Sequence, residues 1–152
     1  EGVFMEYEIL EKCAEIPAYA AAAIKVRHIE AGFVGEAAEI SEKEVMAVLE
    51  RVGKGIEAYL FLDPDGEESF LEVLSDGKWL ALGCSYDFGQ ENYYSYNPDY
   101  ADSREYTPLK SGGQSPIEKR LALTDLEAGR KAVEYFFRTG KPYPGIQWAK
   151  QD

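Results

Sequence analysis

The side chains that most often act as nucleophiles, general bases or metal ligands are scarce in this sequence. His28 is its one histidine, and Cys13 and Cys84 are its two cysteines. These three lack the short, regular spacing of zinc ligands along a chain, so the sequence predicts no metal site. By residue type alone, Cys84 and His28 could form a nucleophilic pair, with Asp87 as a third member. However, Cys84 ends the apolar segment Trp79–Cys84, which favours a buried thiol.

Two glycine-containing segments, residues 52–56 and 111–115, deserve comparison with phosphate-binding loops. Such loops follow a strand, open a helix and have a fixed glycine spacing, and neither segment meets these conditions. We therefore expect no cofactor. Acidic residues are so numerous that an acid–base pair can be drawn almost anywhere, so the sequence assigns no catalytic residue and we expect no enzyme.

Acidic residues form the most distinctive charge pattern. Between residues 57 and 76 there are seven of them and no lysine or arginine. Four gather around one predicted turn: Asp63, Asp65, Glu67 and Glu68. A solvated face explains such a cluster adequately. The functional alternative is a surface that attracts a basic protein partner and accelerates its association.

Tyrosine is the second abundant residue type that binding could use. There are eleven in the chain, and the polar segment 87–107 is rich in them. Tyrosine combines a large apolar ring with a polar hydroxyl, so it serves in cores and at interfaces. Those expected to anchor a partner are Tyr93, Tyr94, Tyr96 and Tyr100.

The elements that must position these residues begin with a helix near the C-terminal end. Thr124 and Glu127 have capping-box spacing, and residues 126–137 carry an apolar stripe at helical spacing, with Arg138 among the residues on the polar face. Gly140 is placed to end this helix in the left-handed conformation, and Pro142 prevents it from continuing. Trp148 beyond it is either a core anchor or an aromatic contact for a partner.

The preceding segments predict a helix and a β-meander. Ser41 and Glu44 form a second capping box, and the helix that follows should end at Gly53 and Gly55. Residues 58–62, 69–74 and 79–86 read as three antiparallel strands joined by turns at residues 63–66 and 75–78. Residues 93–96 fit a further strand, residues 111–116 a flexible loop, and residues 118–123 a short strand.

These elements predict an α+β fold: an antiparallel sheet with one helix before it and one capped helix after it, both packed on the sheet. We expect a single domain over residues 1–152, with its core in residues 41–148. Residues 1–40 form an N-terminal elaboration. Within it, residues 5–9 suit a strand and residues 7–14 suit a helix equally well, whereas residues 23–29 favour a strand.

The net charge of −12 argues against nucleic acid and anionic membranes as partners. Two cysteines far apart in the sequence are too few for a disulfide scaffold and indicate free thiols in a reducing compartment. No apolar run is long enough to span a membrane. The sequence therefore predicts a cytoplasmic protein.

The segment 128–148 resembles the immunity protein 1 family of bacterial polymorphic toxin systems. The residues that carry the resemblance are Ala132, Phe136, Phe137, Thr139, Gly140, Pro142 or Pro144, and Trp148. The order of helix, meander, tyrosine-rich loop and capped helix is also similar, with a looser match over residues 41–96, whereas residues 1–40 fall outside it.

This resemblance implies a cytoplasmic antitoxin that is not an enzyme and that binds one cognate toxin domain. The toxin would commonly be a deaminase or another enzyme directed at nucleic acid, and binding would block its active-site cleft. An acidic chain complements the basic face that such enzymes carry. The alternatives are an acidic adaptor or subunit for another protein, and an enzyme that depends on Cys84.

Overall fold

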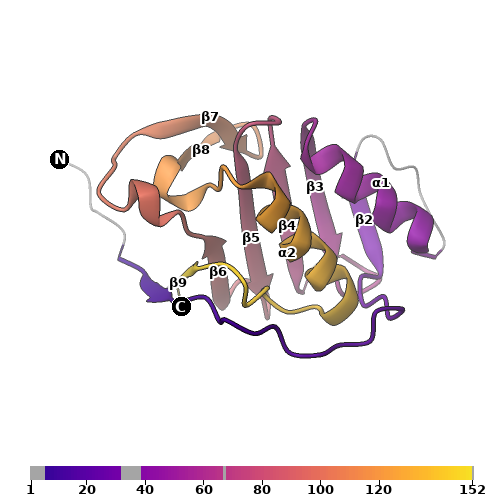
Figure 1. The fold of residues 1–152 in the computed structure, drawn as a ribbon. Coiled ribbons are helices and arrows are strands. Elements are labelled where there is room, and N and C mark those ends of the chain that lie inside the picture. The colour runs from indigo at the N-terminus through magenta and orange to yellow at the C-terminus, as the bar shows by residue number, and fades with distance from the viewer. Residues whose placement is uncertain (1–5, 32–38, 67, 152) are drawn as a thin grey trace.

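The computed structural model describes residues 6–31, 39–66 and 68–151. A seven-stranded sheet, antiparallel throughout, has the order β1-β9-β6-β5-β4-β3-β2 (Figure 1). Its strands are β1 (Glu8–Leu10), β2 (His28–Ala31), β3 (Ile56–Phe61), β4 (Phe70–Ser75), β5 (Leu80–Tyr86), β6 (Glu91–Ser95) and β9 (Trp148–Gln151). Helices α1 (Glu42–Val52) and α2 (Leu126–Thr139) pack on one face of this sheet. The predicted α+β class, the three-stranded meander and the two helices are confirmed.

The main core lies between these helices and the sheet. Alternate residues of each strand face the helices, because successive side chains of a strand point to opposite faces. The helices supply Val45, Val48, Leu49, Val52, Ala132, Val133, Phe136 and Phe137, and the central strands supply Ala58, Leu60, Leu71, Val73, Leu80, Leu82 and Cys84. Burial of each phenylalanine contributes about 1.5–3 kcal/mol. Trp148 is a core anchor, 4% exposed, and its indole N–H donates to the carbonyl oxygen of Tyr143 at 2.7 Å.

Helix α1 begins and ends as the sequence predicts. The Glu44 carboxylate accepts hydrogen bonds from the backbone N–H and the hydroxyl of Ser41, at 2.7 and 2.6 Å. The helix ends at Gly53, and Gly55 follows with a φ of +122°. Glycine adopts a positive φ with little strain, which lets the chain reverse directly into β3.

Helix α2 differs from its predicted form at its N-terminal end. Its N-cap is Asp125 and not Thr124, because the Asp125 carboxylate reaches the N–H of Ala128 at 3.1 Å. The predicted partner of Thr124, Glu127, instead accepts from Arg130. The C-terminal Gly140 has a φ of +73°, as expected.

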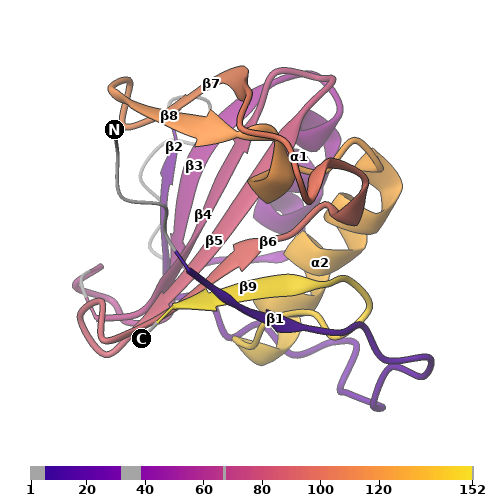
Figure 2. The same cartoon turned by 90° about the vertical axis from the view of Figure 1, so that its left-hand side faces the viewer.

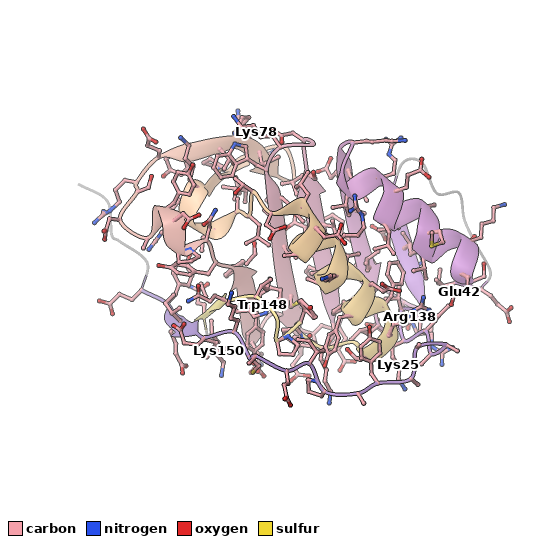
Figure 3. All side chains as sticks on the ribbon, viewed as in Figure 1. Lys25, Glu42, Lys78, Arg138, Trp148 and Lys150 are labelled. Atoms are coloured by element: carbon pink, nitrogen blue, oxygen red, sulfur yellow. The ribbon has the colours of Figure 1, made fainter. Side chains whose placement is uncertain are left out.

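Arg138 was predicted to face water, yet it is buried. Figure 3 shows Arg138 of α2 beside Glu42 of α1, and its two terminal nitrogens donate to that carboxylate at 2.5 and 2.8 Å. Helix α1 covers this side of α2, so the guanidinium needs an anionic partner in place of water. A pattern within one helix could not reveal that contact.

The N-terminal residues supply both edges of the sheet. β1 pairs with β9 at one edge and β2 pairs with β3 at the other. Between them, residues 11–27 run past the C-terminal end of α2, where the N–H of Lys25 donates to the Phe137 carbonyl at 2.7 Å. Of the two alternatives for the first segment, the strand is the one present, at Glu8–Leu10, and Met5 lies outside the described residues. The strand expected at residues 23–29 begins later, at His28.

A second, two-stranded sheet consists of β7 (Tyr106–Ser111) and β8 (Ser115–Glu118). Figure 2 shows both helices on one side of the large sheet and this hairpin across its upper end. The loop predicted at residues 111–116 is instead a tight turn, with positive φ at Gly112 and Gly113. Residues 118–123 are not a strand, because the chain forms a 3-10 turn, η2 (Lys119–Leu121), that brings Arg120 back onto Glu118.

The β7–β8 hairpin covers part of the sheet face opposite the helices. A smaller core forms beneath it from Leu74, Trp79, Ala81, Leu109 and Ala122. The rest of that face, on β2, β3 and β4, has neither helix over it. We call it the open face.

Candidate protein-binding surface

The acidic turn between β3 and β4 is held together by its own first acid. Asp63 Oδ1 accepts hydrogen bonds from the N–H groups of Glu68 and Ser69, at 3.2 and 3.3 Å. Gly66, with a φ of +74°, completes the reversal. Asp63 therefore has a structural role in this turn, whereas Asp65 and Glu68 are exposed. Glu67, the fourth predicted acid, lies outside the described residues.

The turn between β5 and β6 lies beside the acidic turn. The N–H of Phe88 donates to the Glu68 carbonyl at 2.9 Å, and the N–H of Asp87 donates to the Ser69 hydroxyl at 3.3 Å. Asp87 and Phe88 have φ values of +52° and +57°, a conformation that is an outlier for a bulky side chain. The Phe88 side chain is 71% exposed. We call Asp63, Asp65, Glu68, Asp87 and Phe88 the acidic end.

An aromatic cluster lies on the open face. Its members are His28 of β2, Tyr59 and Phe61 of β3, and Phe70 of β4. Phe61 stacks with His28 and Tyr59, with ring centroids 5.6 and 6.0 Å apart, and meets Phe70 edge-on at 5.5 Å. The acidic turn packs against this cluster, because a Cβ on Gly66 would lie 3.1 Å from His28 Cδ2. The acidic end and the aromatic cluster therefore form one continuous surface.

Carboxylates accompany the aromatic rings across the open face. Glu30 Oε2 lies 3.3 Å from His28 Nε2, and Glu57 of β3 is exposed. Glu72 of β4 accepts from the Tyr59 hydroxyl at 3.2 Å. Burial and the charge of Glu72 both raise the pKa of Tyr59, so its phenol remains a neutral donor at neutral pH.

The four predicted tyrosine anchors do not share one surface. Tyr93 lies on the helix side of β6, opposite Cys84, where Lys150 lies over its ring and its hydroxyl donates to Glu91. Tyr94 lies on the other side and meets Tyr7 edge-on at 6.0 Å. Tyr96 follows β6, and Tyr100 lies in η1 (Pro98–Tyr100) against Trp79. Because Trp79 follows the turn at the opposite end of β4, Tyr100 is remote from the acidic end.

Cys84 cannot form the nucleophilic pair drawn from the sequence. It faces the helices, whereas His28 faces the open side of the sheet. Burial raises the pKa of the Cys84 thiol to about 12, which keeps it protonated at neutral pH. Both cysteines are free thiols, and Cys13 is exposed.

Within residues 6–31, 39–66 and 68–151, no group of three or more His, Cys, Asp or Glu side chains is arranged to hold a metal ion. None of the helices in that part of the chain has the length and apolarity needed to cross a membrane.

No family model matches the chain. A search of curated proteins likewise finds no match. The likeness to the immunity protein 1 family therefore remains a resemblance carried by individual residues.

Phe88 is the residue that sequence reasoning missed. The strands on either side of it were predicted. The available signal for Phe88 was an apolar side chain within the polar connection at residues 87–90. A large apolar side chain in a short turn between strands is either packed against the rest of the fold or exposed to solvent, and the sequence does not distinguish these outcomes.

Proposed function

We propose that this chain is an antitoxin of the immunity-protein type, which binds the basic surface of a cognate toxin domain and blocks its active-site cleft. The observation that carries the proposal is the acidic end: exposed carboxylates held around a phenylalanine in a left-handed turn. Interfaces combine an aromatic anchor with surrounding polar groups in this way.

Charge supports a basic partner. The chain has a net charge of −12, and its acidic end and open face carry Glu30, Glu57, Asp65, Glu68 and Asp87. Exposed carboxylates of one sign attract a basic surface over about one Debye length, ~8 Å at physiological salt. A toxin that acts on nucleic acid has such a surface at its cleft, so docking there excludes the substrate.

Backbone geometry supports a binding role for Phe88. A non-glycine residue in the left-handed region is destabilising by about 1–2 kcal/mol, and such strain persists where the surrounding structure over-determines it, often at functional sites. Here the hydrogen bond from Phe88 to Glu68 fixes the turn and leaves the ring exposed. Because the backbone of this turn is already fixed, binding through Phe88 orders little additional backbone.

The first experiment is protection in cells. The toxin domain encoded beside this chain's gene is expressed alone and together with the chain, and growth is measured. Rescue by the wild-type chain, with co-purification of the two proteins, is the expected result. Absence of any toxic domain in the neighbouring genes, or toxicity unchanged by the folded chain, would refute the proposal in favour of an acidic adaptor.

Association kinetics then test the surface. The double variant Asp65→Asn/Glu68→Gln should lower the association rate constant several-fold at low salt, with a smaller effect as salt rises, because exposed charges act mainly on encounter. The matched control, Asp99→Asn/Asp102→Asn, removes two exposed acids at the other end of the sheet. Equal slowing by both pairs would mean that net charge, and not the acidic end, attracts the partner.

A further inference from the structure

A cavity of about 270 Å³ lies between the β7–β8 hairpin and strands β4, β5 and β6 of the large sheet. Its polar lining comprises Tyr7, Glu72, Tyr94, Ser111, Ser115 and Glu118. Gly83 and Tyr94, paired across β5 and β6, contribute from the sheet, and Pro116 and Ile117 contribute from β8. The residues that line it, all in the described part of the chain, include two carboxylates and no cationic side chain.

The two carboxylates differ in what they already bind. Glu118 is engaged by Arg120, whose Nε and terminal nitrogen donate to its oxygens at 3.0 and 3.4 Å. Glu72 accepts at Oε2 from the hydroxyls of Ser111 and Tyr59, at 2.7 and 3.2 Å. No group of the described residues donates to Glu72 Oε1. The cavity wall therefore retains one carboxylate oxygen with full acceptor capacity and a charge that no cation of the lining compensates.

The same corner of the molecule already accommodates one guanidinium. The Arg120 side chain is 7% exposed, and its guanidinium carbon lies 5.3 Å from the centre of the Tyr7 ring while it pairs with Glu118. A carboxylate beside a tyrosine ring thus holds a buried guanidinium here. Glu72 and Tyr94 offer the same combination inside the cavity, where burial and then the charge of Glu72 raise the pKa of Tyr94.

We propose that this cavity receives one arginine side chain of a protein partner, with its guanidinium on Glu72 Oε1 and against the Tyr94 ring. That the arginine belongs to a toxin rests on the function proposed above, whereas the chemistry of the cavity does not. Drug-sized ligands occupy pockets of roughly 300–1,000 Å³, so a cavity of this volume suits a single side chain.

Arginine fits the lining better than lysine. Its planar guanidinium stacks on aromatic rings and donates to a carboxylate through a rigid fork, and it is more weakly hydrated than an ammonium group. The hydroxyls of Ser111 and Ser115 in the lining can accept from its remaining N–H groups.

The test uses the isolated full chain and a small probe. The amide resonances of the chain are followed by NMR during titration with Nα-acetyl-arginine amide, the corresponding lysine amide, and the neutral citrulline amide. We expect saturable shifts around Gly83 and Tyr94 with the arginine probe, weaker binding of the lysine probe, and no saturation with citrulline.

Two variants locate the effect. Glu72→Gln keeps the shape and an acceptor for Tyr59 and Ser111 but removes the charge, and should weaken binding of the arginine probe at least about tenfold. Glu127→Gln removes an exposed charge from α2, on the other face of the sheet and outside the cavity, and should leave that affinity unchanged. Equal affinity in Glu72→Gln, or no saturable shift in the wild-type chain, would overturn the proposal.

These outcomes are separable from those of the proposed function. A chain that protects cells but does not bind the arginine probe is an antitoxin that uses other contacts. Conversely, a chain that binds the probe but has no toxin partner retains an arginine-binding cavity.

Discussion

Replacement of Phe88 by glycine should strengthen the fold and weaken the complex. Phe88 has a φ of +57° and its side chain is 71% exposed. Glycine adopts this conformation without the penalty of about 1–2 kcal/mol that a Cβ brings. The ring buries little surface in the free chain, so its removal sacrifices little hydrophobic stabilisation.

The net gain is smaller than the relieved strain. Glycine also increases the conformational entropy of the unfolded chain, and this cost offsets about 0.5–1 kcal/mol of the relieved strain. The difference leaves about 0.5–1 kcal/mol of additional stability, or a rise in Tm of roughly 1–4 °C for a domain of this size. Binding should change in the other direction: loss of an aromatic anchor corresponds to about 2 kcal/mol, roughly a 30-fold higher Kd.

Phe88→Ala is the matched comparison. Alanine keeps the left-handed penalty and removes the ring, so its Tm should stay near that of the wild-type chain while its Kd rises as far as that of Phe88→Gly. Thermal unfolding of both variants, with calorimetric Kd values for the toxin domain, separates backbone strain from side-chain contact. A lower Tm for Phe88→Gly would show that the ring packs on the fold, and an unchanged Kd would remove Phe88 from the interface.

Three further predictions concern the fold. Gly129→Ala should destabilise the fold by about 1–3 kcal/mol in urea denaturation despite the better helix propensity of alanine, because its Cβ would overlap Cδ2 of the fully buried Leu80. The effect should shrink in a Leu80→Ala background, and stabilisation by Gly129→Ala would refute so close a contact. With a thiol reagent at pH 8, exposed Cys13 should react in the native chain and Cys84 only after unfolding, because burial raises the pKa of Cys84 to about 12. The hydrogen bond from Arg138 lowers the pKa of Glu42 in the folded chain. The stability that this pair contributes is therefore present above the pKa of the carboxyl in the unfolded chain and is lost as pH falls through its pKa in the folded chain. In an acid titration, Glu42→Gln should lose stability less steeply than the wild-type chain, and identical curves would contradict this prediction.

The sequence was most informative where structure follows from neighbouring residues. The Ser41 capping box, the left-handed Gly140 and the turns between β3, β4 and β5 depend on contacts within a few positions, and all three are present. The choice between two adjacent candidate N-cap residues was less predictable. Thr124 and Asp125 can both cap a helix, and the choice depended on which side chain reached the N–H of Ala128.

Long-range contacts explain the remaining differences. Arg138 carries the sequence signature of a water-facing residue, and its burial follows from Glu42, which is 96 positions away. The acidic turn was predicted, but its neighbour Phe88 reaches it only because β5 returns alongside β4. Composition predicts the tyrosine anchors but not their direction, and strand alternation places Tyr93 and Tyr94 on opposite faces.

The position of β9 has a consequence for how this chain folds. β9 lies inside the sheet, between β6 and β1, so Tyr94 pairs with Ala149 and Ile9 pairs with that same Ala149 from the other side. Ala149 is about 55 positions from Tyr94 and about 140 from Ile9, so both pairings require closure of a long loop and are slow. Until β9 docks, β6 presents an unpaired edge with its tyrosines beside it, a template for pairing with another chain. Aggregation during refolding should therefore depend on how quickly β9 docks, and a chaperone that shields the β6 edge would raise the yield without changing the stability of the folded protein.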